Sequence, residues 1–193
     1  MRPRAIVLVT GMLLLTACDA TMPLRDIPLE WQPTSTVSPG PPMTSQARIE
    51  FRTFKDVSEH PQLIAENRED PATPKQVTTR DNVGSFVTTH LRQLFEQAGL
   101  ATVDQGGDVI VTGEVRQFFV AETATYEGTV VLHVSFSDRD GKVLWSGSPT
   151  GTARRFGRSY SQENYYEVLA DSLVNACSSL LRDRDVRAAI AHH

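Results

Sequence analysis

A short apolar run behind two arginines is the feature that most limits what this chain can fold into. Arg2 and Arg4 precede an uncharged, mostly apolar run over residues 5–15, and two small residues follow it. This is the layout of a secretory signal peptide. As a helix the run would rise about 16 Å, whereas the hydrocarbon core of a bilayer is about 30 Å thick, so it is too short for a permanent transmembrane helix. We therefore expect residues 1–17 to be a signal peptide.

A cysteine stands directly after this leader. The segment Leu15-Thr16-Ala17-Cys18 resembles the bacterial lipobox, in which a cysteine follows a leucine and small residues at the cleavage point. The resemblance implies that Cys18 is diacylated on its sulfur and becomes the mature N-terminus. Two or three acyl chains, at about 0.8 kcal/mol per buried CH₂, would hold such a protein on a membrane essentially permanently. The alternative is a cysteine that happens to begin a buried helix.

The residue after the cysteine bears on the choice of membrane. Asp19 resembles the signal that retains lipoproteins in the inner membrane of enteric bacteria. The rule varies between bacterial groups, so both the outer and the inner membrane stay open. In either case we expect a lipid-anchored protein of the cell envelope that faces the periplasm.

The next segment is interpreted as a tether. Six of the chain's eleven prolines lie in residues 18–45, and these residues show neither helical nor strand periodicity. A flexible coil of this length would span about 30 Å and an extended path about 80 Å. Leu29 and Trp31 either dock onto the domain, lie at the bilayer interface, or stay isolated in a mobile tether. Residues 46–193 are then expected to fold alone as the globular domain.

Two segments have the spacing of amphipathic helices. Apolar residues recur every three or four positions in residues 83–98 and again in residues 162–181. Thr79 or Asp81 is placed to cap the first helix, and Gly99 to end it in a left-handed conformation.

Alternation of apolar and polar residues predicts the strands. The pattern marks four segments, of which the last three are expected to be consecutive antiparallel strands: 47–52, 108–120, 128–137 and 142–147. Asp138-Arg139-Asp140-Gly141 supplies a tight turn between the last two. By contrast, the polar and proline-punctuated residues 56–79 are expected to be the least ordered part of the domain.

These elements predict an α+β domain. A mainly antiparallel sheet covered on one face by two helices, a two-layer sandwich, accounts for the order of the elements. Leu91 and Leu173 are central in the two helical stripes and are expected to be buried against the sheet. Asp171, Asn175 and Ser178 point away from the second stripe, and a short helical tail is expected over residues 186–190.

Composition and motifs argue against catalysis and against a cofactor. Removing residues 1–17 takes away two arginines and no acid, which moves the formal net charge from −4 to −6, so a nucleic-acid partner is not expected. Two cysteines are too few for a disulfide framework or a four-cysteine zinc site. No H-E-x-x-H or G-x-S-x-G motif occurs. We therefore assign no catalytic, cofactor-binding or metal residue, and we expect Cys177 to be an inert buried thiol and His90 a partly buried histidine bonded to a neighbour.

The basic cluster Arg154, Arg155 and Arg158 is the candidate for partner binding. It lies between the last predicted strand and the final helix. Three guanidinium groups near a helix N-terminus could hold phosphate, a lipid headgroup or an acidic partner loop. The alternative is a solvated loop with Phe156 turned inward.

Two further candidate contacts lie on strands. Phe118 and Phe119 are neighbours, so alternation forces them to opposite faces of the sheet. One of the two is therefore a candidate exposed contact, and His133 is another.

From about Arg48 to Ile190 the chain resembles a family of small envelope lipoproteins, the YajG type, and more distantly the auxiliary lipoproteins of ABC transport systems. The resemblance rests on four segments: Ile49-Glu50-Phe51, Val83 to Gly99, Asp108 to Phe118, and Asp185 to Ile190. Where that family often has an Asp and an Arg after the first strand, this chain has Lys55-Asp56-Val57. The resemblance implies a non-enzymatic binding, assembly or transport accessory factor with an envelope protein partner. The alternatives are a structural lipoprotein bridging membrane and cell wall, and an enzyme whose site is assembled from distant residues.

Overall fold

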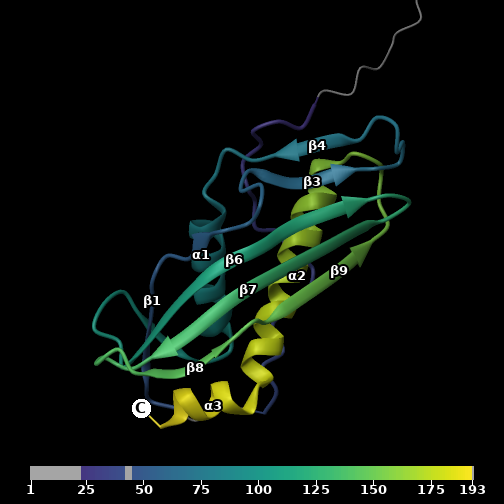
Figure 1. Cartoon of the computed structure of the whole chain (residues 1–193). Coiled ribbons are helices and arrows are strands. Elements are labelled where there is room, and N and C mark those ends of the chain that lie inside the picture. Colours follow the sequence, from purple (N-terminus) through teal and green to yellow (C-terminus); the bar gives the residue numbers. More distant parts are fainter. Residues whose placement is uncertain (1–22, 42–44, 193) are drawn as a thin grey trace, which may run out of the picture.

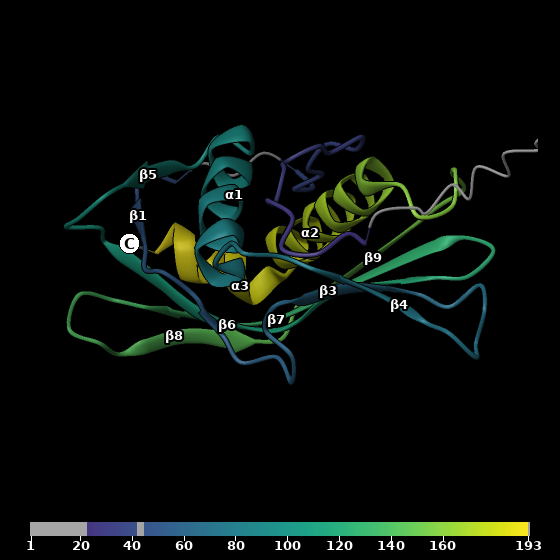
Figure 2. The same cartoon turned by 90° about the horizontal axis from the view of Figure 1, so that it is seen from above.

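The described part of the chain has two layers. The computed structural model describes residues 23–41 and 45–192, so the predicted signal peptide and Cys18 lie outside the described residues. A nine-stranded sheet forms one layer (Figure 1), and the helices α1 (Val83–Gln97) and α2 (Gln162–Arg182) cover one of its faces (Figure 2). The short helix α3 (Arg184–Ala191) lies at one end of the molecule, where the helical tail was predicted. The α+β sandwich is therefore confirmed.

Two long antiparallel strands form the centre of the sheet. The strands in chain order are β1 (Arg48–Phe51), β2 (Lys55–Asp56), β3 (Leu63–Asn67), β4 (Lys75–Thr78), β5 (Ala101–Val103), β6 (Val109–Glu122), β7 (Tyr126–Ser137), β8 (Val143–Gly147) and β9 (Thr150–Arg155). β6 pairs with β7, and β8 and β9 both pair with β7, all antiparallel. On its other edge β6 pairs with β1, β2 and β3 in parallel. The central hairpin therefore joins an antiparallel half to a parallel half.

The stretch expected to be least ordered, residues 56–79, is part of this sheet. β3 and β4 form an antiparallel pair, and β3 also pairs in parallel with β6 from Ala65 to Asn67. Its three prolines flank the two strands and do not interrupt them. The expectation was wrong because these strands are short, and because the pairing with β6 that orders them joins residues far apart in the chain.

The cap of α1 also differs from the prediction. The side chain of Asn82 accepts the N–H of Ser85 at 2.8 Å, whereas Thr79 and Asp81 bond to residues that precede the domain. At the other end the helix stops as predicted, because Gly99 has φ +85°.

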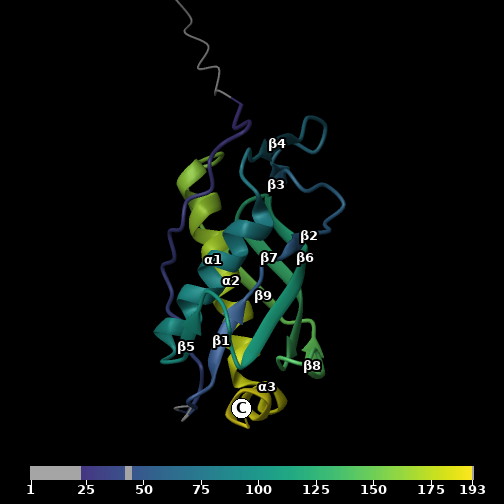
Figure 3. The same cartoon turned by 90° about the vertical axis from the view of Figure 1, so that its left-hand side faces the viewer.

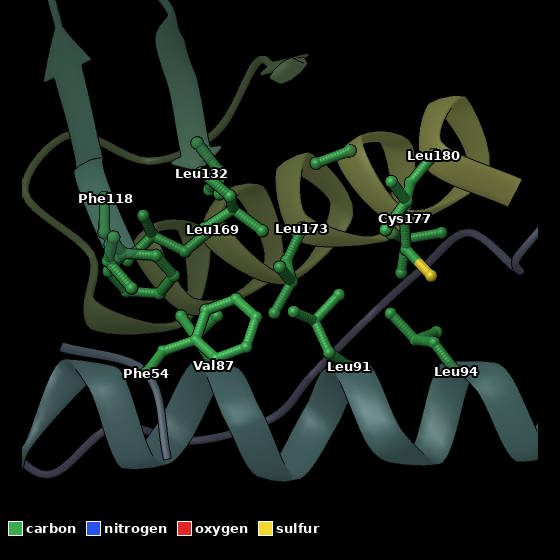
Figure 4. Packing of buried hydrophobic residues seen from close by; sticks show 14 of the residues in the cluster. Phe54, Val87, Leu91, Leu94, Phe118, Leu132, Leu169, Leu173, Cys177 and Leu180 are labelled. Carbon is green, nitrogen blue, oxygen red and sulfur yellow. The ribbon is translucent and has the colours of Figure 1, made fainter. Parts of the chain in front are cut away.

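The core lies between the two helices and the sheet. Leu91 on α1 and Leu173 on α2 point toward one another (Figure 4) and are 1% and 0% exposed, as predicted. In Figure 4, Phe54 and Phe118 close this layer at one end, while Cys177 and Leu180 lie at the other.

The largest departure concerns residues 23–41, which we call the N-terminal strap. Figure 3 shows the strap running along the helical layer on the side away from the sheet. Ile27 is buried, and Leu29, Trp31 and Val37 pack against the hydrophobic core. The alternative in which Leu29 and Trp31 dock onto the domain is therefore confirmed, and a tether that stands off from the domain is wrong for these residues. Their apolar side chains are irregularly spaced in a chain segment that is neither helix nor regular strand, so periodicity could not reveal the docking.

Candidate functional site

The carboxylate of Asp171 on α2 accepts four hydrogen bonds from the strap. Asp171 accepts the backbone N–H and the hydroxyl of Thr34 at 2.8 and 2.6 Å, and those of Ser35 at 2.9 and 2.8 Å. Partial burial acts to raise the pKa of Asp171, but these four hydrogen bonds together bring it below its ordinary value. The charged form of the carboxylate therefore holds the strap.

Ser178 is a second polar residue of α2 that forms a hydrogen bond with the strap. Ser178 was predicted to point away from the apolar stripe, and it does, yet it is only 4% exposed. The strap covers it, and the N–H of Ser38 donates to its hydroxyl at 2.9 Å. Asn175 stays exposed, as expected.

Both ends of the strap are fixed. At its start, the N–H of Leu24 donates to the hydroxyl of Tyr160 at 2.9 Å, and its carbonyl accepts the N–H of Thr78 at 3.1 Å. At its end, the guanidinium of Arg187 donates to the carbonyls of Pro39 and Pro41 at 3.1 and 2.9 Å. The strap therefore follows the helical layer over its whole length.

The predicted basic cluster is only partly a loop, because Arg154 and Arg155 lie at the end of β9, a strand that the sequence pattern did not mark. Arg154 lies 3.3 Å from the carboxylate of Glu127, and Arg155 forms an ion pair with Glu167. Arg155 also donates to the hydroxyl of Thr34 in the strap at 3.3 Å. Arg158 is exposed in the loop that leads into α2. Arg154 and Arg158 are therefore both exposed to a partner, whereas Arg155 is partly buried in its ion pair.

The aromatic residue of the same loop points outward. Phe156 is 78% exposed, so the alternative in which it turns into the core is wrong. The ring of Phe156 is therefore available for a contact outside the fold.

The face of the sheet away from the helices carries a second candidate surface. Phe118 is 4% exposed in the core, while its neighbour Phe119 is partly exposed on the outer face. The guanidinium of Arg68 lies 6.0 Å from the ring centroid of Phe119. Around this pair is an open hollow of about 510 Å³, also lined by His60 and Arg116 among others.

The prediction for the two phenylalanines is confirmed, but the hollow was not predicted. Its other wall comes from the β3 region, which the sequence pattern had placed in an irregular stretch. The apolar run Leu63-Ile64-Ala65 was the signal that could have indicated this strand. His133 lies on the same face, 3.4 Å from the hydroxyls of Ser146 and Ser148.

Cys177 and His90 are placed as the sequence predicted. Burial raises the pKa of the Cys177 thiol, which keeps it protonated. His90 is partly buried and bonded to Gln93 at 2.8 Å, and burial lowers its pKa. Within residues 23–41 and 45–192 no group of three or more His, Cys, Asp or Glu side chains could hold a metal ion, and no helix is long and apolar enough to cross a membrane.

A buried acid near the start of α2 is likewise structural. Glu122 is 1% exposed, and its carboxylate accepts the hydroxyl of Tyr165 and, at 2.9 Å, the N–H of Tyr160. The bond to its N–H holds Tyr160 in a left-handed backbone conformation at φ 53°, which a residue other than glycine rarely adopts. Glu122 therefore fixes the loop that also receives the start of the strap.

Comparison with known proteins agrees with a role in the envelope. The family model LptE, described as lipopolysaccharide assembly, matches residues 64–187, which extend from β3 into α3 and make up well over half of the chain. The chain belongs to the LptE family. This is a family of non-enzymatic lipoproteins of the bacterial envelope. The expectation of a bacterial envelope lipoprotein is therefore confirmed. The narrower YajG type is not confirmed.

Solved structures match this LptE family member at low sequence identity, and the first of the two that follow shares its fold. A protein from Xanthomonas campestris, of the family known as DUF330, is 18% identical, with 77% of this chain and 90% of that chain covered and a TM-score of 0.56. A PelC protein from Paraburkholderia phytofirmans, solved as a dodecamer, is 17% identical, with 72% and 94% covered and a TM-score of 0.43. No curated protein matches the chain.

Proposed function

We propose that this LptE family member is a lipid-anchored, periplasm-facing lipoprotein of the outer membrane that assists lipopolysaccharide assembly without catalysing a reaction. It acts together with an envelope protein partner. The observation that carries the proposal is the family match, which spans the folded body from β3 into α3. The lipobox at Cys18 supports the anchor.

The outer face of the sheet is the proposed contact surface. The hollow around Phe119 combines an aromatic ring with two guanidinium groups, those of Arg68 and Arg116. One guanidinium group can donate two parallel hydrogen bonds to phosphate oxygens, and an aromatic ring can pack against a sugar or an acyl chain. The combination therefore fits a phosphorylated glycolipid. Each arginine now lies beside a glutamate, Glu66 at 2.5 Å and Glu114 at 3.9 Å, and would exchange it for phosphate.

The function is tested by depletion in cells. Loss of the protein should lower the amount of lipopolysaccharide at the surface of intact cells, measured with an antibody to its saccharide, while total lipopolysaccharide is maintained or rises. The wild-type chain should restore the surface signal. Normal surface lipopolysaccharide after depletion would contradict the proposal.

The contact surface is tested by photo-crosslinking. A photoreactive amino acid in place of Phe119 should yield an adduct that an antibody to lipopolysaccharide detects. Ser179, exposed on α2 within the helical layer, is the matched control position and should yield none. Equal adducts at both positions, or none at Phe119, would remove the hollow from the proposal and leave the family function to the depletion experiment.

A further inference from the structure

The docked strap limits how far the domain can lie from the membrane. The described chain begins at Pro23, which is five residues after Cys18. Five residues span at most about 18 Å when fully extended. If Cys18 carries the lipid, as the proposed function states, the start of the strap lies close to the bilayer, whereas a free tether would allow about 30 to 80 Å.

We infer that the end of the domain that receives the start of the strap lies against the lipid surface, with Phe156 in the headgroup region. We call this the Tyr160 end, formed by Leu24 and Arg25 of the strap, Lys75 at the start of β4, and the loop of residues 156–161. The occupant of this surface is the bilayer that holds the acyl chains.

The parts of the Tyr160 end are joined by direct contacts. The hydroxyl of Tyr160 accepts the N–H of Leu24 at 2.9 Å, and the ammonium of Lys75 lies 5.2 Å from the ring centroid of Tyr160. Phe156 is only four residues before Tyr160, so it lies within about 14 Å of this point. The first residues of the strap and the exposed phenylalanine are therefore at the same end of the molecule.

The loop that carries Phe156 is held firmly. The hydroxyl of Tyr126 donates to the carbonyl of Arg158 at 2.6 Å and accepts the N–H of Ser161 at 3.0 Å. The buried carboxylate of Glu122 accepts the backbone N–H of Tyr160 and so fixes the backbone there. The part of the loop that directly follows Phe156 is therefore fixed, while the Phe156 ring stays exposed.

The chemistry of this end suits a lipid interface. A phenylalanine ring can enter the boundary between headgroups and acyl chains, as it does in interfacial helices, and an exposed arginine such as Arg158 can bond to lipid phosphate. Acidic side chains also lie at this end, among them Asp26, Glu69 and Asp70, so its charge gives no strong attraction of its own. The contact therefore depends on the anchor and on the short distance to it, and salt should change it little.

The opposite end of the sheet offers a matched control. Arg155 pairs with Tyr126 at one end of β7, and Val143 pairs with Ser137 at the other. Eleven residue steps along a strand correspond to about 36 Å. Val143 is an exposed apolar side chain like Phe156, at 59% against 78%. A probe at each position therefore reports on one end of the domain.

The experiment uses the acylated mature chain in vesicles of phosphatidylethanolamine and phosphatidylglycerol. A cysteine is introduced by Phe156→Cys or Val143→Cys and labelled with the fluorophore NBD; Cys18 is blocked by acylation and Cys177 is buried. Lipids carrying a nitroxide near the headgroup should quench the fluorescence at position 156. At position 143 they should leave it at the level seen without nitroxide. Equal quenching at both positions, or quenching at 143 alone, would overturn the inference.

Flotation of the same vesicles separates this inference from the anchor on which it rests. If the acylated chain does not float with the vesicles, the anchor proposal fails and the inference fails with it. If the chain floats and position 156 is not quenched, only the orientation is wrong. About 20 Gly and Ser residues inserted before Pro23 would lengthen the segment between Cys18 and Pro23 to a typical span of about 25–30 Å. The quenching at position 156 should then decrease. Unchanged quenching in that variant would overturn the argument from the short segment between Cys18 and Pro23.

Discussion

The indole ring of Trp31 lies flat on the imidazole ring of His90, with 4.2 Å between the ring centroids and 7° between the ring planes. Phe86 meets both rings edge-on, at 6.2 Å from Trp31 and 4.4 Å from His90. The stack joins the strap to α1, just as Asp171 joins it to α2. A segment that the sequence suggests to be a flexible tether is therefore a structural part of the domain.

Trp31→Ala should destabilise the domain. Removing a partly buried indole and its ring contacts is expected to lower the free energy of unfolding by about 1–3 kcal/mol. Urea denaturation of the soluble chain that begins at residue 19 measures the change. Thr36→Ala, an exposed position of the same strap, is the control and should stay within about 0.5 kcal/mol. A loss no larger for Trp31→Ala than for this control would mean that the strap adds nothing to stability.

Leu91→Ala and Leu173→Ala should each cost about 2–5 kcal/mol of unfolding free energy, through the lost transfer energy and the cavity left behind. Both side chains are fully enclosed between the helices and the sheet. Ser179→Ala on the exposed side of α2 should have little effect in the same denaturation series. Losses below about 0.5 kcal/mol for both leucines would contradict the packing in Figure 4.

Acid should loosen the strap. The pKa of Asp171 is lowered in the folded chain, so its stabilising effect is complete above the ordinary carboxyl pKa of about 4 and is lost as the pH falls through the lowered value. Hydrogen exchange at the amides of Thr34 and Ser35, corrected for intrinsic rates, should show less protection at low pH than at pH 7.

Asp171→Asn is the matched variant for this pH effect. The amide keeps the size of the carboxylate but not its charge, so protection of the two amides should be reduced already at neutral pH. It should then change less with acid than in the wild type. An unaltered pH response in Asp171→Asn would assign the loosening to another group.

Arg155 and Arg158 should respond differently to charge reversal. Arg155→Glu places a second negative charge beside Glu167 in a half-buried pair, and is expected to cost on the order of 1–3 kcal/mol of stability. Arg158→Glu, at an exposed position, should leave the melting temperature nearly unchanged. Thermal denaturation of the two variants measures this, and equal losses would show that the loop is held differently. Partner binding by the basic loop is thus best tested with Arg158 alone.

Cys18→Ser should abolish labelling of the protein with radioactive palmitate in growing cells, because serine offers no sulfur for the diacylglyceryl group. The serine variant should also leave the membrane fraction. Label that persists in Cys18→Ser would show that another residue carries the lipid. The argument that the five residues from Cys18 to Pro23 keep the domain close to the membrane would then fail.

Local patterns in the sequence were enough to predict the helices and strands that bury one continuous face. The stripe that contains Leu91, the stripe that contains Leu173 and the alternation along β7 each repeat with the period of their own backbone, so neighbouring residues carry the information. Gly99 and Gly141 mark a helix end and a turn for a similar reason, because positive φ favours glycine, and both have it. The same local reasoning separated Phe118 from Phe119.

The remaining features depend on partners distant in the chain, and only the tertiary structure could decide them. Ser178 looks like a solvent-facing residue until Ser38, 140 positions earlier, covers it. Arg154 and Arg155 look like a free basic patch until the fold brings Glu127 and Glu167 beside them. The strap has no period of its own, because its conformation follows the surfaces of α1 and α2, which it contacts through Trp31 and Thr34. A chain segment whose shape is set by another surface leaves no repeating pattern in its own sequence.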